Sequence, residues 1–419
     1  MSDAPRRFRG EPPLLAYGIS FALLSSLGQT FLISLFVPSF TDEFALSDGA
    51  FGGLYSAATL VSAMLLPWAG RRLDHVRLTR FSVAVVMLMA FSALTLAAAP
   101  NVAVLGIALV GLRLSGQGLS GHTAYTVMAR YSGARRGRAL SIASLGFPAG
   151  EALLPYLTAI ALVAFGWRRT WVLFAAVAAL VFTPALVVAL RRAEIELDPR
   201  RLDDGPDNGP DAGPPGRGRA LSAGSGDWTR AAVLKDRRLL YALPAALLPS
   251  FWLTGIFLYQ TRIAASKGWS LPLMASAFVG FAASRVVFSL LAGRVVDRLS
   301  ARTTYPFVLL PMAFALALPL AFDDRWVPYG LMTGLGMTMG FGEPVRSSLW
   351  AELYGVRHLG AIKAMIASFG VLAAAGSPVL IGLALDSGTA FDSILWAGLV
   401  TTLAGAGLAT GLIRGSGAG

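Results

Sequence analysis

Apolar residues along this chain gather into long runs that are separated by short polar segments. Each run holds about 20 residues or more, which is the length that an α-helix needs to cross the hydrocarbon core of a bilayer. The pattern therefore predicts an all-α membrane protein with twelve transmembrane helices. The predicted helices lie near residues 14–40, 49–69, 80–98, 102–128, 138–165, 170–190, 239–261, 271–292, 303–322, 327–353, 360–384 and 391–413.

A polar segment in the middle of the chain divides these helices into two groups of six. Residues 203–219 are rich in Pro, Gly and Asp, a composition that cannot bury a core. We therefore predict two six-helix halves joined by a flexible cytoplasmic linker. The predicted parts are a cytoplasmic tail 1–13, a first half 14–190, the linker 191–238, a second half 239–413 and a cytoplasmic tail 414–419.

The two halves carry matching residues in one ungapped register. The matched pairs are Gly70 with Gly293, Arg71 with Arg294, Asp74 with Asp297, Gly111 with Gly334, Tyr131 with Tyr354, Gly137 with Gly360, and Pro155 with Pro378. Chance matches of Ala and Leu are expected in apolar sequence, whereas coincident Gly, Asp, Tyr and Pro are not. The repeat predicts two halves related by an axis along the membrane normal, with a substrate site between them near the middle of the bilayer.

Composition and charge narrow the class of protein. Hydrophobic residues make up 55% of the 419 residues and charged residues only 14%, against about 25% charged residues in an average soluble domain. The net charge of +12 would suit a nucleic-acid partner. The basic residues, however, gather in loops on the side of the N-terminus, and this bias predicts that both termini and the linker are cytoplasmic. We therefore expect a multi-pass protein of the cell (inner) membrane whose partner is the lipid bilayer and no nucleic acid.

The short loops after the second and eighth predicted helices share a pattern of Gly, Arg and Asp. The first contains Gly70, Arg71, Asp74 and Arg77, and the second contains Gly293, Arg294, Asp297 and Arg298. The pattern resembles the signature loop of the major facilitator superfamily. The resemblance implies the major facilitator fold, transport by alternating access, and a role for both loops as a cytoplasmic gate. An Asp that meets helix N-termini and Arg side chains would hold this gate shut.

A more particular pattern surrounds the fifth predicted helix. Its members, in chain order, are Arg135, Arg136, Ala139, Ala143, Gly146, Gly150, Pro155, Gly166, Trp167 and Arg168. This order resembles the monocarboxylate porter family, and the resemblance implies a small carboxylate as the substrate. Those porters place a substrate-binding Arg in the eighth helix. This chain has Ser289 at that position and Arg285 about one turn deeper in the same helix.

Ionisable residues inside the predicted helices are the candidates for function. Five of them lie well within these helices, namely Arg113, Glu151, Arg285, Glu343 and Arg346. An unpaired charge in the membrane costs at least ~2.5–3.5 kcal/mol, so these side chains should face partners or a water-filled cavity. The excess of Arg over Glu favours an anionic substrate, because Arg binds a carboxylate through two parallel hydrogen bonds.

Each of these charges has a functional and a structural interpretation. Arg285 is the first candidate for substrate binding, with Arg113, Arg346, Gln29 and Tyr259 as further candidates. Arg285 would otherwise form a structural ion pair with Glu343, and Arg113 would otherwise tie helices together.

Glu151 and Glu343 are the candidates for proton coupling, unless their ion pairs are permanent. Burial favours a neutral carboxyl group and an adjacent Arg favours the ionised one. An Arg that alternately engages and releases the Glu would therefore let it bind and release a proton. Glu343 and Arg346 are spaced so that they can pair along one helix face.

These observations predict a secondary active transporter of a small, monocarboxylate-like organic anion that works as a proton symporter, as a monomer and without a cofactor. The alternative is a proton-driven exporter of drugs or amphipathic metabolites, which would have a larger aromatic cavity with acidic charges. An enzyme is not expected, because His75, His122 and His358 lack metal-binding spacing and no nucleophile motif is present.

Overall fold

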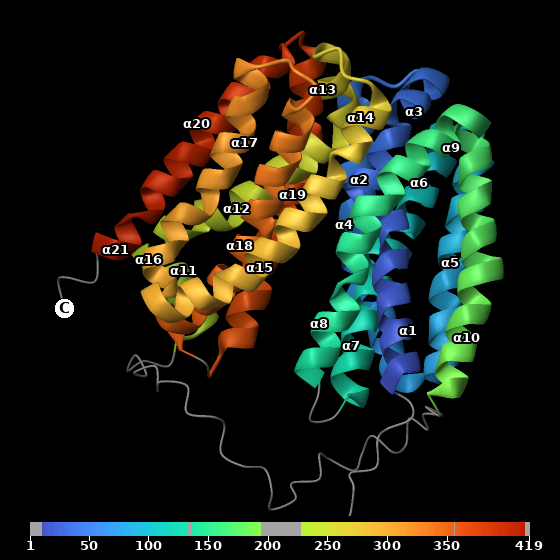
Figure 1. The fold of residues 1–419 in the computed structure, drawn as a ribbon, viewed down its shortest axis with the longest axis horizontal. Coiled ribbons are helices and arrows are strands. Elements are labelled where there is room, and N and C mark those ends of the chain that lie inside the picture. The colour runs from blue at the N-terminus through green and yellow to red at the C-terminus, as the bar shows by residue number, and fades with distance from the viewer. Residues whose placement is uncertain (1–10, 133–135, 194–227, 356, 415–419) are drawn as a thin grey trace, which may run out of the picture. The chain divides into compact units, whose positions relative to one another are not determined.

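The computed structural model describes residues 11–132, 136–193, 228–355 and 357–414, and its regular structure there is helical (Figure 1). All twelve predicted transmembrane ranges are largely helical. Most of the predicted linker and most of both predicted tails lie outside the described residues. The main helices are α1 (Glu11–Leu24), α2 (Thr30–Ile33), α3 (Val37–Phe44), α4 (Asp48–His75), α5 (Leu78–Ala97), α6 (Val102–Leu112), α7 (Gly121–Tyr131), α8 (Arg136–Ser144), α9 (Gly146–Val177), α10 (Thr183–Arg192), α11 (Arg230–Leu234), α12 (Arg237–Leu258), α13 (Gln260–Ser266), α14 (Leu271–Ser276), α15 (Phe278–Leu299), α16 (Ala301–Thr304), α17 (Leu310–Ala321), α18 (Val327–Tyr354), α19 (Leu359–Asp386), α20 (Phe391–Ala409) and α21 (Gly411–Arg414).

The contacts divide the chain into two compact units. Unit 1 comprises Met1–Ser39 and Ala57–Pro206, and unit 2 comprises Phe40–Ser56 and Asp207–Gly419. The boundary between the units therefore falls inside α4, whose first turns belong to unit 2 and whose remainder belongs to unit 1.

Among the described residues, nine helices are long and apolar enough to cross a membrane, or ten with one bent pair included. The bent pair is Pro12–Gly28 with Thr30–Phe44, inclined by 47°. It corresponds to the first predicted helix. The break falls at Gln29, whose backbone is extended (φ −84°, ψ 151°) between two helical segments.

Ten candidate spans among the described residues are two fewer than the twelve predicted helices, and each of the two differences has a local cause. Gly137–Arg192 is one of the nine, although it covers two predicted helices. Gly166 separates them with a φ of +74°, in the left-handed region that glycine enters without a Cβ penalty. The predicted helix at 327–353 forms as α18, but it is not among the nine. Its glycines and the charges of Glu343 and Arg346 lower its hydropathy.

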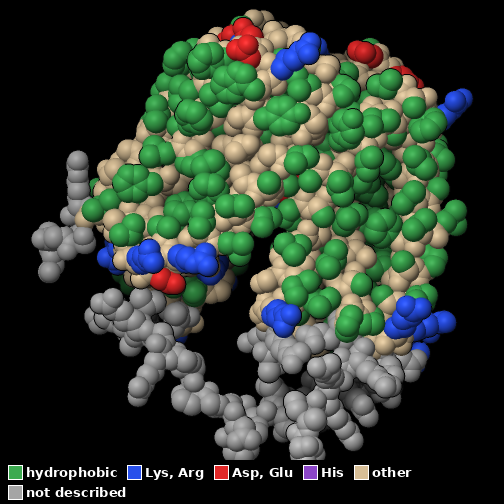
Figure 2. Space-filling model, viewed as in Figure 1, with side chains coloured by type: hydrophobic (Ala, Val, Ile, Leu, Met, Phe, Trp, Pro, Cys, Tyr) green, Lys and Arg blue, Asp and Glu red, His purple; other side chains and the backbone are tan. Residues whose placement is uncertain are grey.

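The surface of each unit is suited to lipid. Large apolar side chains are exposed in both units, including Val163 (78%) and Leu180 (75%) in unit 1 and Leu290 (69%) and Phe314 (65%) in unit 2. On the face seen in Figure 2, hydrophobic side chains cover the middle of each unit, while Lys and Arg lie near helix ends. A surface with an apolar middle and charged ends is what a bilayer requires of a spanning helical protein.

Candidate functional site

Arg113 is buried in unit 1, with 3% of its surface exposed. It begins a π-helical segment, Arg113–Ser120, in the middle of the fourth predicted helix. Its Nη1 donates to the carbonyl oxygen of Gly28 at 3.2 Å and to Oγ1 of Thr30 at 3.3 Å. These acceptors flank the break in the first predicted helix, where the intrahelical hydrogen bonds are interrupted. Arg113 therefore links the fourth predicted helix to the first.

Gln29 and Glu151 lie on elements that pack against the same break. The backbone carbonyl of Gln29 accepts hydrogen bonds from the N–H groups of Leu32 and Ile33, both at 3.2 Å. Its side chain is half-buried. Glu151 lies on α9, which packs against the segment Ser25–Gly28, and only 7% of its surface is exposed. Unit 1 thus gathers the elements that carry Arg113, Gln29 and Glu151 around the broken first helix.

In unit 2, Glu343 and Arg346 form an ion pair along one face of α18, as their spacing predicted. The side chain of Glu343 is 68% exposed and that of Arg346 is 23% exposed. Both side chains line a small pocket. The other lining residues come from α12, from the segment Tyr305–Leu309 and from α18, and they are Ala245, Pro249, Tyr305, Val308, Thr338, Met339 and Gly342.

The hydroxyl groups of Tyr305 and Thr338, which line this pocket, already donate hydrogen bonds to backbone carbonyls. The Tyr305 hydroxyl donates to the carbonyl oxygen of Ala242 at 3.0 Å, and Thr338 Oγ1 donates to Gly334 at 3.1 Å. The Glu343 carboxylate and the Arg346 guanidinium are therefore the charged groups that the pocket offers to a ligand. An Arg guanidinium can bind a carboxylate through two parallel hydrogen bonds.

Arg285 lies on α15, and its helix crosses α18 at very close range. A Cβ added at Gly340 would overlap the carbonyl oxygen of Arg285, so only glycine permits this approach. The Arg285 side chain is half-buried. The crossing fixes the backbone of Arg285 beside Gly340, one turn before Glu343 on α18. The structure therefore places Arg285 on the helix next to the one that carries the ion pair.

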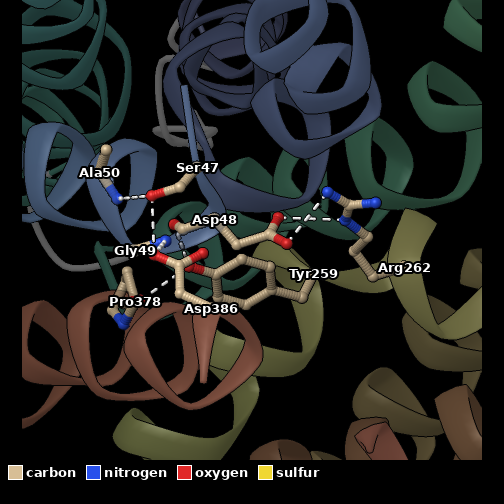
Figure 3. A network of polar contacts seen from close by, with 8 residues as sticks. All are labelled: Ser47, Asp48, Gly49, Ala50, Tyr259, Arg262, Pro378 and Asp386. Carbon is tan, nitrogen blue, oxygen red and sulfur yellow. Dashed lines mark hydrogen bonds and ion pairs between the residues drawn. The ribbon is translucent and has the colours of Figure 1, made fainter. Parts of the chain in front are cut away.

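Tyr259 lies at a different place in unit 2. Its ring is fully buried, and its hydroxyl lies close to the backbone carbonyls of Asp48 (3.0 Å) and Pro378 (2.7 Å) (Figure 3). Asp48 is the first residue of α4 and Pro378 lies within α19. A hydroxyl with a single proton that is shared between two carbonyls has no donor left for a substrate. Tyr259 therefore holds helices together, and we do not retain it as a substrate-binding residue.

The two predicted gate loops differ in their contacts. In the first loop, Asp74 forms an ion pair with Arg130 near the end of α7. Arg71 and Arg77 are exposed, and Gly70 lies opposite the His122 ring. In the second loop, Gly293, Arg294, Asp297 and Arg298 are all exposed, and no partner of Asp297 is found among the described residues.

The second predicted loop lies mostly within α15, and the acid that contacts the residues directly after α15 is Glu352 on α18. Its carboxylate accepts hydrogen bonds from the backbone N–H groups of Ala301 (2.8 Å) and Arg302 (3.1 Å) at the start of α16. The Arg302 guanidinium donates in turn to the Glu352 carbonyl at 3.2 Å. The repeat in the sequence had indicated Asp297 for such a role. Glu352 lies at the end of the tenth predicted helix, 327–353, and therefore outside the loop pattern.

The match to known families decides the class of protein. The family model described as "Major Facilitator Superfamily" matches residues 19–262, more than half of the chain. The chain belongs to the major facilitator superfamily. This protein is therefore a multi-pass membrane protein and a secondary transporter that works by alternating access, and it is not an enzyme. No curated protein sequence matches the chain.

Solved structures agree with this fold. The chain is similar to a bacterial homologue of the human lysosomal transporter Spinster in an inward-facing, unoccupied conformation. The TM-score is 0.65 at 15% identity, over 98% of this chain and 95% of that one. The inward-facing, occupied conformation gives a TM-score of 0.63 at 15% identity, over 99% and 98% of the two chains. At this identity the likeness establishes the fold of this major facilitator protein.

Proposed function

We propose that this transporter carries a small organic anion of the monocarboxylate type together with a proton. The observation that carries the proposal is the ion pair of Glu343 and Arg346 at a pocket within a predicted membrane-spanning helix. The order of residues from Arg135 to Arg168, which resembles the monocarboxylate porters, supports the same class of substrate. Arg135 itself lies outside the described residues.

The ion pair supplies the coupling chemistry. When Glu343 is ionised, its carboxylate is paired with the Arg346 guanidinium. A proton added to Glu343 removes that negative charge and weakens the pair. The carboxylate of a substrate can then take the place of the Glu343 carboxylate, with two parallel hydrogen bonds to the guanidinium. Release of the proton and of the anion restores the original pair, so one anion and one proton move together.

The other predicted charges have supporting parts in this proposal. Arg285 remains a candidate for substrate binding, because its backbone on α15 lies beside Gly340, one turn before Glu343. Arg113 keeps the broken first helix in place through its contacts with Gly28 and Thr30. Glu151, which is almost fully buried in unit 1, is the second candidate for proton coupling. We place the protein in the cell (inner) membrane with both termini in the cytoplasm, as the distribution of basic residues predicts.

Transport by proteoliposomes tests the proposal. Labelled acetate, lactate and pyruvate serve as probes, and an inward proton gradient is imposed. We expect the gradient to drive the uptake of at least one probe, and we expect Arg346→Ala and Arg285→Ala to abolish it. Arg325→Gln is the matched control, since Arg325 is an exposed loop residue and its loss should leave uptake unchanged.

Two results would reject the anion assignment. One is uptake that persists at the parental rate in Arg346→Ala and Arg285→Ala. The other is proton-driven export of an amphipathic cation that depends on Glu343 and is indifferent to both Arg residues, which would favour the drug-exporter alternative.

A further inference from the structure

Lys363 is a basic residue of a predicted membrane-spanning helix, and its only side-chain partner is a neutral hydroxyl. It lies near the start of α19, and its side chain is half-buried. Its Nζ donates to Oγ of Ser347 on α18 at 2.5 Å. No carboxylate of the described residues forms an ion pair with Lys363, whereas Lys267 pairs with both Asp323 and Asp392.

Two structural explanations of Lys363 fit this contact poorly. A lysine near a helix end commonly extends its side chain to the interface and keeps the ammonium in water. The Lys363 ammonium instead lies against Ser347 of the neighbouring helix. The residue does not stabilise its own helix either, because a positive charge is favourable at the C-terminal end of a helix and Lys363 is near the N-terminal end of α19.

Lys363 and Ser347 together retain hydrogen-bond donors for an anion. A Lys ammonium has three N–H donors, and Ser347 accepts from one of them. The Ser347 hydroxyl is the acceptor in this contact, and its own O–H has no acceptor among the described residues. Two N–H groups and one O–H group therefore remain side by side. A carboxylate, which has two acceptor oxygens, is complementary to this set of donors.

The contact between Lys363 and Ser347 lies close to the ion pair of Glu343 and Arg346. Ser347 follows Glu343 by four residues on α18, so their side chains lie on one helix face, one turn apart. Arg346 directly precedes Ser347. From Glu343, α18 continues toward Tyr354 and the loop before α19, the side that the basic residues predict to be cytoplasmic. Lys363 therefore adds a second cation on the cytoplasmic side of the ion pair.

We propose that Lys363 and Ser347 form a second binding site for the substrate carboxylate, between Arg346 and the cytoplasm. This inference rests on the proposed function, because its ligand is the anion that Arg346 would bind. An anion that leaves the Arg346 guanidinium next meets the Lys363 ammonium and the Ser347 hydroxyl. While it is held there, Glu343 can lose its proton and pair with Arg346 again. The second site thereby keeps the anion from returning to Arg346.

Chemical modification of lysine tests the second site. The chain contains three lysines, Lys235, Lys267 and Lys363, of which Lys235 is exposed. Methylation with formaldehyde and dimethylamine–borane, followed by mass spectrometry of peptides, gives the reaction rate of each lysine in the detergent-solubilised protein. We expect saturating acetate or lactate to slow the methylation of Lys363 several-fold and to leave Lys235 unchanged. Lactamide, with sodium chloride to match the ionic strength, is the neutral control and should protect neither lysine.

Two adjacent serines provide a matched pair of variants. Ser347→Ala removes one donor of the second site and retains Lys363 as the reporter. We expect the lactate concentration that protects half of Lys363 to rise several-fold in this variant. Ser348→Ala is the control, since Ser348 points to another side of α18 and has no contact with Lys363. That variant should be protected like the parent.

Transport supplies an independent measurement. Lys363→Met keeps an unbranched side chain and removes the ammonium, so we expect proton-driven anion uptake to slow several-fold. Lys363→Arg retains the charge and should restore most of the rate. Lys235→Met, at the exposed lysine, should transport like the parent. Size-exclusion chromatography in detergent establishes that each variant is folded.

The assays separate failure of the second site from failure of the proposed function. Acetate or lactate that binds should raise the Tm of the parent, because a ligand stabilises the state that it binds. A raised Tm without protection of Lys363 would overturn the second site and leave the proposed function in place. Equal protection by lactamide, or equal effects of Ser347→Ala and Ser348→Ala, would also overturn the second site. Absence of any effect of these anions on Tm, methylation and uptake would reject the anionic substrate and the second site together.

Discussion

The Glu352 carboxylate accepts a hydrogen bond from the backbone N–H of Ala301 at 2.8 Å. This contact joins the end of α18 to the start of α16 in unit 2. Asp74 and Arg130 join the ends of α4 and α7 in unit 1. In unit 1 the acid follows the second helix and its basic partner lies on the fourth. In unit 2 the acid lies on the tenth predicted helix and accepts from backbone N–H groups at the start of α16, so the two acids occupy different positions in the repeat.

Replacement of Glu352 should weaken unit 2. Glu352→Ala leaves the N–H groups of Ala301 and Arg302 without their acceptor at a helix N-terminus. The loss of such a cap typically costs about 0.5–2 kcal/mol. Thermal unfolding in detergent should therefore show a lower Tm for Glu352→Ala. Asp297→Ala is the control and should stay within about 0.5 kcal/mol of the parent. An equal decrease in Tm for Glu352→Ala and Asp297→Ala would contradict a stabilising role for the Glu352 contact.

The ion pair of Asp74 and Arg130 should make a smaller contribution. Its side chains are 46% and 31% exposed, respectively. Exposed pairs of this kind contribute about 0.2–1 kcal/mol, and salt screens them. A double-mutant cycle with Asp74→Asn and Arg130→Gln measures the coupling energy. We expect a coupling in that range at low salt which shrinks at high salt. A coupling that salt leaves unchanged would contradict the exposed geometry.

The number and order of the helices could be predicted from the sequence because the bilayer imposes a fixed length on each apolar run. The family could be predicted as well, since the loop at Asp74 carries a local pattern. The pairing of Glu343 with Arg346 also follows from local spacing on one helix. These features depend on residues that are neighbours in the chain or on the periodicity of a single helix.

Features that depend on distant residues escaped prediction. Asp48, Arg262 and Asp386 meet in space although they lie on separate helices. Tyr259 looked like a cavity residue because an aromatic hydroxyl in an apolar run has no visible partner in the sequence. Its partners are backbone carbonyls, which every residue possesses. The break at Gln29 likewise has no Pro or Gly at its centre to reveal it, although Gly28 precedes it.

The crossing of α15 and α18 should tolerate no side chain at Gly340. Gly340→Ala places a methyl group against the Arg285 carbonyl oxygen, and backbone cannot yield as a flexible side chain can. Overpacking of this kind costs about 1–3 kcal/mol. Gly407→Ala is the matched control within a helix, because a Cβ there meets nothing within 4 Å. That change should be neutral or stabilise by about 0.5–1 kcal/mol. Equal Tm values for the two variants would contradict the close crossing.

The cluster of Lys267 with Asp323 and Asp392 should make stability depend on alkaline pH. Partial burial lowers the pKa of Lys267, but hydrogen bonds and charges from Asp392 and Asp323 outweigh it, so the net pKa is raised above its ordinary 10.5. A raised pKa stabilises the fold fully below the unfolded value, and this contribution is lost as the pH rises through the folded value.

The difference in Tm between the parent and Lys267→Met should therefore be constant from pH 7 to about 10 and should shrink above that. Asp324→Asn, at an exposed neighbouring acid, should leave this pH profile unchanged. A difference that already shrinks near neutral pH would show that Lys267 loses its proton too easily for this arrangement.

The proposed exchange at Glu343 makes a prediction about charge movement. One anion and one proton carry no net charge together, so an imposed membrane potential should not change steady-state accumulation by the parent protein. Glu343→Gln imitates the protonated side chain and removes the proton from the cycle. Anion movement by that variant should then carry one negative charge. A potential of 100 mV should change its accumulation ratio by about 50-fold, since one charge is worth about 2.3 kcal/mol per 100 mV. Liposomes with potassium gradients and valinomycin set the potential, and labelled lactate reports accumulation. Accumulation by the parent that follows the potential would contradict one-to-one coupling at this ion pair.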